Sequence, residues 1–161
     1  MIILGIDPGT ATTGYGLIEE EKGQVTVIAY GCILTSAKKL PDERLEEISR
    51  KLTEIIKKYR PHELAVEELF FANNAKTAIA VGQARGVVLL TAKQNCCPTF
   101  EYTPLQVKNA ICGYGGADKK QVQKMVQLLL KLKEIPKPDD AADALAIAIC
   151  HINSRKFNNI S

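Results

Sequence analysis

The stretch Ile2–Ile3–Leu4–Gly5–Ile6–Asp7–Pro8–Gly9–Thr10 runs from apolar residues directly into a turn. Branched apolar residues followed by Pro–Gly predict a buried β-strand that ends in a turn. The strand should end at Asp7, because Pro8 has no N–H to donate to a sheet. A carboxylate thus stands at the carboxyl end of a core strand, at the edge of an α/β sheet where ligands bind. Aspartate before Pro–Gly is also a common turn former, and these residues alone favour the turn.

The composition is that of one ordinary globular domain. The chain has 161 residues, of which 46% are hydrophobic and 24% are charged, enough for a single core. We expect one domain over residues 1–155 and a short tail over 156–161. The N-terminus lacks the basic segment and long apolar run of a signal peptide. No apolar stretch is long enough to cross a bilayer. These features predict a cytoplasmic protein with no signal peptide and no membrane contact.

The cysteines and histidines give no sign of a zinc site. The five cysteines are scattered, apart from the adjacent Cys96 and Cys97, and form no paired metal-ligand pattern. We expect them to be buried thiols in a reducing cytoplasm. Because the only histidines are His62 and His151, zinc bound by histidine is not expected.

Hydrophobic periodicity predicts an α/β fold with a five-stranded mixed sheet. Three strands over residues 2–7, 14–19 and 24–34 are joined by short turns, which favour an antiparallel meander. An amphipathic helix follows from residue 40 to Tyr59. The right-handed crossover rule then places a fourth strand, 64–68, parallel to the first. The rest of the chain is predicted to form a long helix, a fifth strand and three further helices, over residues 77–94, 98–102, 103–111, 118–132 and 139–153.

Acidic residues end one further strand and open the last helix. Glu67 and Glu68 end the fourth strand. Since side chains alternate along a strand, only one of the two can point toward Asp7, and the pattern leaves open which. Asp140 and Asp143 are three residues apart on a helix and therefore project from one face. Capping and the helix dipole are the simpler explanation for acids in a first turn. They explain Asp143 less well, because it lies on an alanine-lined surface.

Convergence of these acids would create a site with four carboxylates. Such a cluster is unstable in its fully ionised form unless cations are bound. Oxygen ligands suit Mg²⁺ or Mn²⁺ rather than zinc. Two such ions, about 3.5–4 Å apart, are the usual arrangement for phosphodiester hydrolysis. The acids therefore predict a hydrolytic site with two Mg²⁺ ions, for which Mn²⁺ can substitute.

Two helices carry features that allow two interpretations each. The helix over 118–132 presents Lys119, Lys120 and further lysines, which form either a solvated face or a footprint for a nucleic-acid backbone. The net charge of the whole chain, +3, neither requires nor excludes nucleic acid. The helix over 77–94 is rich in alanine and glycine, which fits either the core or a homodimer contact.

Four groups of residues form a pattern of high specificity when they occur together. They are Gly5–Thr10 with Thr13–Gly16, Glu67 with Phe70 and Asn74, Gly82–Gly86, and Asp140–Ala146. The pattern resembles the RuvC family of bacterial Holliday-junction resolvases, within the ribonuclease H–integrase superfamily. The resemblance extends from Met1 to about His151, nearly the whole chain. It implies a ribonuclease H-like fold, with three antiparallel and then two parallel strands flanked by helices, and makes residues 1–155 a RuvC-like nuclease domain.

The resemblance also implies roles for the acids. Asp7, Glu67, Asp140 and Asp143 match the catalytic acids of the family, which bind the metal ions. Glu68 falls at a position where the family has no catalytic residue. The choice between the two glutamates, which side-chain alternation left open, is thereby made in favour of Glu67.

Further roles follow from the resemblance for one aromatic residue and several lysines. Phe70 matches an aromatic residue that stacks on a base near the crossover of the junction. Lys108 and Lys119 match basic residues that support cleavage, Lys119 as part of the catalytic group, and Lys120 is expected to bind DNA beside them. The family is a homodimer that nicks two opposing strands of a four-way junction symmetrically during recombination and repair. It works with the branch-migration proteins RuvA and RuvB.

Three other classes of protein share part of this pattern. ATP-binding proteins of the actin, heat-shock-chaperone and sugar-kinase class open with a similar strand and Asp-x-Gly-Thr loop, but they need two such domains and this chain has one copy. A related nuclease acting on RNA would share the acids, so substrate choice separates it from a DNA enzyme. A non-catalytic junction-binding module is disfavoured, because a binder of phosphates has no use for clustered negative charge.

Overall fold

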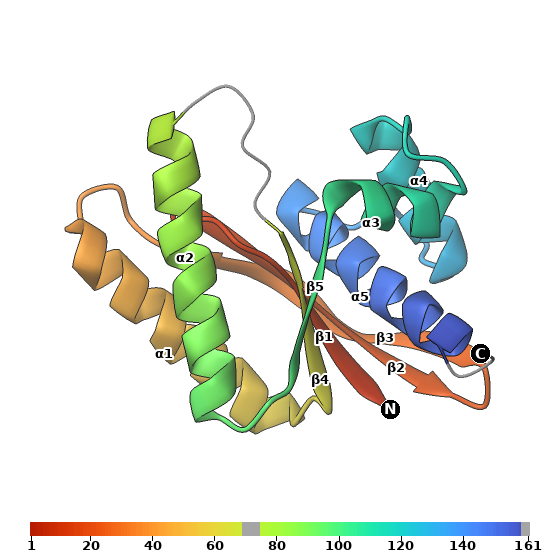
Figure 1. The fold of residues 1–161 in the computed structure, drawn as a ribbon, viewed down its shortest axis with the longest axis horizontal. Coiled ribbons are helices and arrows are strands. Elements are labelled where there is room, and N and C mark those ends of the chain that lie inside the picture. The colour runs from red at the N-terminus through yellow and green to blue at the C-terminus, as the bar shows by residue number, and fades with distance from the viewer. Residues whose placement is uncertain (69–74, 159–161) are drawn as a thin grey trace.

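A five-stranded sheet runs through the middle of the computed structural model, which describes residues 1–68 and 75–158 (Figure 1). The strands are β1 (Ile2–Asp7), β2 (Thr12–Glu21), β3 (Gln24–Leu34), β4 (Glu63–Glu67) and β5 (Thr99–Tyr102). Their order across the sheet is β3-β2-β1-β4-β5. The first three strands are antiparallel, whereas β4 runs parallel to both β1 and β5. This is the mixed sheet that the sequence predicted.

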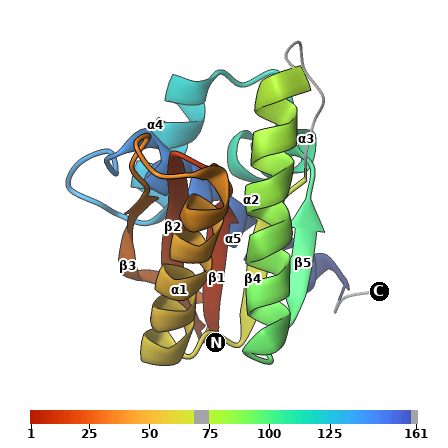
Figure 2. The same cartoon turned by 90° about the vertical axis from the view of Figure 1, so that its left-hand side faces the viewer.

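Helices cover both faces of the sheet. On one face lie α1 (Pro41–Tyr59) and α2 (Ala75–Gln94), in front of the sheet in Figure 2. On the other face lie α3 (Pro104–Cys112), α4 (Lys119–Leu129) and α5 (Asp139–Asn158). Within the described part of the chain, no helix is both long enough and apolar enough to cross a bilayer.

The apolar run of β1 is continuous because both of its faces are buried. Ile3 belongs to the core that includes α5, whereas Leu4 and Ile6 belong to the core beneath α1 and α2. All three side chains are fully buried. The chain emerges from this double core at Asp7, so the first polar side chain after the run lies at the edge of the sheet.

The ends of three predicted elements were wrong by a few residues, and β2 and α2 each begin two residues before the predicted start. β2 extends to Glu21, because Lys22 and Gly23 both adopt positive φ and close a two-residue hairpin. α4 ends at Leu129 instead of residue 132, since Lys131 is left-handed and the side chain of Gln127 donates to the carbonyls of the next turn. α5 continues to Asn158, past the predicted end at residue 153.

The expectation that all five cysteines are buried was also wrong. Each is a free thiol, but only Cys97 and Cys150 are buried. Cys96 is exposed because it follows the end of α2 in a left-handed conformation that turns its side chain outward. Cys32 and Cys112 are half-buried.

α5 lies close against β1 and β2 because the strands carry glycine where the helix crosses them. A Cβ added to Gly5 would lie 2.0 Å from the carbonyl oxygen of Ala144, and one added to Gly14 would lie 2.0 Å from that of Asp140. Any side chain at these positions would push α5 away from the sheet. The two glycines therefore set the position of the helix that carries Asp140 and Asp143.

Gly5→Ala is expected to destabilise the protein by about 1–3 kcal/mol, because backbone atoms of α5 must move to admit the methyl group. Urea denaturation followed by circular dichroism measures the loss. Gly116→Ala is the matched control, since its Cβ would meet no atom closer than 3.6 Å. Equal stability losses in the two variants would contradict this account of α5.

The far end of α5 is held by a buried hydrogen-bond network. His151 Nε2 lies 2.6 Å from a carboxylate oxygen of Glu63, at the start of β4. A carboxylate only accepts, so Nε2 carries the proton and Nδ1 accepts from the hydroxyl of Tyr102 at 2.7 Å. Burial lowers the pKa of His151, which keeps the ring neutral. α5 is thus fixed at one end by glycine contacts and at the other by His151.

Candidate active site

A cavity of about 220 Å³ lies at the carboxyl ends of β1 and β4. Its polar lining consists of three acids and two lysines, and its apolar lining consists of residues from α3, α4 and α5: Asp7, Glu67, Asp143, Lys108 and Lys119, with Pro104, Val107, Val122 and Ala146. The structure therefore brings together three of the four predicted acids, from positions that are far apart along the chain. We call this cavity the acid pocket.

The parallel pairing of β1 and β4 places two of the acids side by side. Ile6 of β1 pairs with Val66 of β4, and the next residue on each strand is an acid, Asp7 or Glu67. Glu68 is exposed, is absent from the lining, and donates its N–H to Tyr102 O of β5. The geometry thus selects Glu67 from the two glutamates that side-chain alternation left open.

Asp140 lies beside the acid pocket, outside its lining. It is half-buried, and its carbonyl packs against Gly14, the residue of β2 that pairs with Asp7. Its negative charge still raises the pKa of Asp7. Asp140 therefore belongs to the same electrostatic cluster but stands on the β2 side of it.

The acids of the pocket hold their protons far more tightly than ordinary carboxyls. Burial, and then the charges of Asp143, Glu67 and Asp140, raise the pKa of Asp7 from 3.8 to about 8. Burial and the charge of Asp143 raise the pKa of Glu67 from 4.5 to about 7. The pKa of Asp143 is also raised, mainly by burial and against the opposing effect of Lys119. Like charges at this density favour either protons or bound cations.

Lys119 is the cation nearest to the acids. Its Nζ lies 3.1 Å from Asp143 Oδ2 and 3.6 Å from Asp139 Oδ2. Burial alone would lower the pKa of Lys119, but the hydrogen bond to Asp143 and the nearby carboxylates raise it overall. Lys108 lines the same pocket, and its charge lowers the pKa of Glu67.

One of the predicted DNA-binding residues lies outside the acid pocket, and another falls outside the described residues. Lys120 follows Lys119 on α4 but lines a neighbouring cavity instead of the acid pocket. Phe70 lies outside the described residues, so its stacking role stays a prediction.

The donor chemistry of the acid pocket suits a hard divalent cation. Its possible ligands are carboxylate oxygens, and the three acids of the lining carry more negative charge than the two lysines can neutralise. Among residues 1–68 and 75–158, no three His, Cys, Asp or Glu side chains are arranged to hold one ion. Mg²⁺ does not require such a cage, because it is commonly bound by one or two carboxylates together with water and substrate phosphate. The residues present therefore fit Mg²⁺ shared between protein and a phosphodiester.

One neighbour of the acids was not anticipated from the sequence. Burial, and then the charge of Asp140, raise the pKa of Cys32 to about 11. Strand register could have revealed this position, since Cys32 pairs with Gly14 and Gly14 pairs with Asp7. A protonated thiol next to the acids adds no further negative charge to the cluster.

Comparisons with known proteins agree with this arrangement. A family model described as "Crossover junction endodeoxyribonuclease RuvC" matches residues 3–151. Proteins of that name from Desulfitobacterium hafniense (strain DSM 10664 / DCB-2) and Syntrophomonas wolfei are 59% and 55% identical over 159 residues, which is 99% of this chain and 96% and 92% of theirs. The solved structure "T. thermophilus RuvC in complex with Holliday junction substrate" superposes with a TM-score of 0.93 at 36% identity, covering 98% of this chain and 96% of that one. The chain belongs to the RuvC family of crossover junction endodeoxyribonucleases.

Proposed function

We propose that the chain is a Mg²⁺-dependent endonuclease that resolves four-way DNA junctions by nicking two opposing strands symmetrically, during recombination and repair. The observation that carries this proposal is the meeting of Asp7, Glu67 and Asp143 with Lys108 and Lys119 in one pocket. The similarity to a structure solved with a Holliday junction supports the choice of substrate.

The residues of the acid pocket suggest how the cleavage works. When bound, the divalent ions supply an activated water and neutralise charge on the leaving oxygen. Asp7 and Glu67, held on neighbouring strand ends, would hold the ions together with Asp143 of α5. Lys119 neutralises Asp143 in the free protein and is placed to turn its ammonium toward the phosphate, where negative charge develops. Lys108, which lines the same pocket, holds the approaching strand by its charge.

One assay decides the proposal. Purified protein is incubated with a synthetic four-way DNA junction in Mg²⁺ or in chelator, and the nicks are mapped on all four strands. We expect paired nicks on opposing strands with Mg²⁺, and with Mn²⁺ in its place, but none in chelator. Structured RNA of the same shape and an ATP-binding assay serve as comparisons, because they separate the two rival classes. Cleavage of RNA in preference to DNA, or nicking in chelator, would count against the assignment.

A homodimer is the form we propose for the active enzyme. α2 buries Ala84, Val88 and Ala92 in the core, yet its opposite side exposes Ile79 and Leu90, which are 64% and 58% exposed. Gln83 and Gly86 lie between them at helical spacing and are also exposed. An exposed face with apolar side chains at helical spacing can pack against the same helix of a second copy of the chain. The core and dimer interpretations of this helix therefore apply to opposite faces.

Sedimentation at micromolar concentration tests the dimer. We expect a dimer for the wild type and a monomer for Ile79→Glu combined with Leu90→Glu, since two buried charges would oppose the contact. Gln94→Glu, at the exposed end of α2, is the control. A wild-type monomer at this concentration would remove the dimer from the proposal.

Phe70→Ala is expected to weaken junction cleavage while the fold stays intact. A base stacked on an aromatic side chain contributes about 1–3 kcal/mol, so the loss should be about 5- to 150-fold. Cleavage rates and thermal melting of the variant measure the two quantities. Normal cleavage by Phe70→Ala would exclude the stacking role, and a lowered melting temperature would indicate that Phe70 covers the core.

We further propose that the protein works in the cytoplasm together with RuvA and RuvB, as its resemblance to the family implies. Co-sedimentation with those two proteins on a synthetic junction tests this association. If the protein sediments separately from both RuvA and RuvB, the association is contradicted.

A further inference from the structure

A second cavity lies beside the acid pocket, on the other side of α4. Its volume is about 410 Å³, and it is lined by Cys112, Tyr114, Asp118, Lys120, Gln121, Lys124 and Met125. We call it the tyrosine pocket. The same two helices line both cavities: α4 places Lys119 in the acid pocket and Lys120 in the tyrosine pocket, and α3 places Lys108 in one and Cys112 in the other.

The two cavities lie close enough for one DNA strand to reach both. Lys108 and Cys112 are four residues apart on α3, which corresponds to about 6 Å along the helix. One strand of DNA carries a phosphate for about every 3.4 Å of helix axis. A strand with its scissile phosphate in the acid pocket would therefore reach the tyrosine pocket within about one to three nucleotides.

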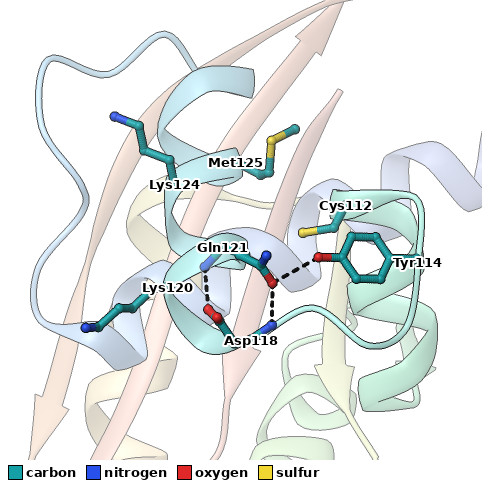
Figure 3. A pocket seen from close by; sticks show the side chains of 7 residues that line it. All are labelled: Cys112, Tyr114, Asp118, Lys120, Gln121, Lys124 and Met125. Atoms are coloured by element: carbon teal, nitrogen blue, oxygen red, sulfur yellow. Dashed lines mark hydrogen bonds between the residues drawn. The ribbon is translucent and has the colours of Figure 1, made fainter.

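Tyr114 is held in a fixed orientation at the edge of this cavity. Its hydroxyl donates to Gln121 Oε1 at 3.0 Å, and the same oxygen accepts from the Asp118 N–H at 2.8 Å (Figure 3). Asp118 is the N-cap of α4, and its carboxylate accepts from the Gln121 N–H at 2.8 Å. Tyr114 as a whole residue is 49% exposed. An aromatic ring that is both fixed and exposed can stack on a partner with little loss of conformational entropy.

The charges of the tyrosine pocket are arranged across it. Figure 3 shows Lys120 and Lys124 on one side and Tyr114 on the other, with Asp118 between them. The lining thus carries two ammonium groups and one carboxylate, and the carboxylate already accepts a hydrogen bond from the backbone. Within the described part of the chain, the Lys124 ammonium donates to the neutral side chain of Gln127 at 2.9 Å, a partner that it can exchange for an anion.

We propose that the tyrosine pocket binds one nucleotide of the DNA strand that flanks the cleavage site. Its base stacks on Tyr114, and its phosphate contacts Lys120 and Lys124. Stacking on an aromatic ring combined with ammonium contacts to the backbone is how proteins hold a DNA strand that is not paired at that position. The inference rests on the proposed junction cleavage and adds to it a subsite outside the acid pocket.

Three variants of the full-length protein test the subsite. Tyr114→Ala should raise both the Kd and the KM for a synthetic junction by about 5- to 150-fold, with the larger part of any loss of activity in KM. Tyr114→Phe keeps the ring and should stay within about threefold of the wild type. Lys120→Gln combined with Lys124→Gln should reduce the slope of log Kd against log salt by about 1 to 2. This pair lies on the surface and does not depend on how Tyr114→Ala folds.

Matched controls come from residues that line neither cavity. Lys57→Gln combined with Lys58→Gln removes two exposed charges from α1, and Tyr30→Ala removes a tyrosine of similar exposure, 38%, from β3. Junctions carrying 2-aminopurine one, two or three nucleotides from the nick report stacking directly. We expect quenching at one of these positions with the wild type and with Tyr114→Phe, but not with Tyr114→Ala.

The outcomes separate this inference from the proposed function. Kd values for Tyr114→Ala equal to those of the control variants, an unchanged salt slope for the lysine pair, or no quenching at any position would each overturn the subsite. In each of these cases, normal cleavage by the wild type would still support the proposed junction endonuclease. Conversely, quenching that depends on Tyr114 in a protein that never nicks junctions would overturn the proposed function and support the pocket alone.

Discussion

Asp7→Asn is expected to bind four-way junctions as tightly as the wild type and to cut them at least about 10²–10³-fold more slowly, the scale of losing one electrostatic contact to a transition state. Asparagine keeps the shape of the side chain but removes a charge that the ions require. Because the pKa of Asp7 is raised most among the acids of the pocket, the substitution should reduce the cleavage rate more than the affinity for DNA. Gel-shift and single-turnover cleavage assays on one junction measure both quantities.

Two neighbouring glutamates provide the control for this experiment. Glu67 lines the acid pocket, whereas Glu68 is exposed and points elsewhere. Glu67→Gln should therefore resemble Asp7→Asn, and Glu68→Gln should cut like the wild type. Normal cleavage by Asp7→Asn, or equal losses in the two glutamate variants, would remove the acid pocket as the catalytic site.

Without divalent ions, the free energy of unfolding should fall as the pH rises from about 6.5 to 8. The pKa of Asp7, about 8, and that of Glu67, about 7, exceed their ordinary values of 3.8 and 4.5. The folded protein therefore binds more protons than the unfolded chain in this window, and stability is lost as these groups ionise. The expected loss is on the order of 3 kcal/mol. His151, whose pKa is lowered from 6.5, acts in the opposite direction at lower pH, so the window begins above that value.

Chemical denaturation in chelator at several pH values measures this loss. Mg²⁺ should restore stability, and by more at pH 8 than at pH 6.5, because only ionised carboxylates bind the ion. Asp7→Asn should flatten the profile in chelator and be more stable than the wild type at pH 8. A profile that rises with pH in chelator, or Mg²⁺ stabilisation that is independent of pH, would contradict the electrostatic account of the pocket.

The sequence predicted the fold well because its strongest signals are local. Pro8 ends β1 and Pro61 follows the end of α1, and the apolar run of β1 requires cover on both faces. The predicted helix ends were wrong where a backbone conformation or a side-chain hydrogen bond ends the helix, as at Lys131 and Gln127 near the end of α4. The hydrophobic periodicity of the sequence continues past these residues, so it cannot show where the helix ends.

The residues of the site also fall into those that local sequence patterns indicate and those that they do not. Strand ends and helical spacing indicated Asp7, Asp140 and Asp143, but they could not choose between Glu67 and Glu68, because alternation depends on which face of β4 meets α5. Only the resemblance made that choice, and the register of β1 with β4 agrees with it. The tyrosine pocket was not foreseen, since it depends on a loop that carries Tyr114 back to Gln121.

The contact of α5 with the glycines of β1 and β2 has a consequence for hydrogen exchange. The helix that carries two of the acids is also the most deeply enclosed one, with Ala141, Leu145 and Ile147 almost fully buried. Its amide protons should exchange only when the whole domain opens. The acids on α5 then share the lifetime of the native state itself, and loss of activity on heating should coincide with loss of the fold.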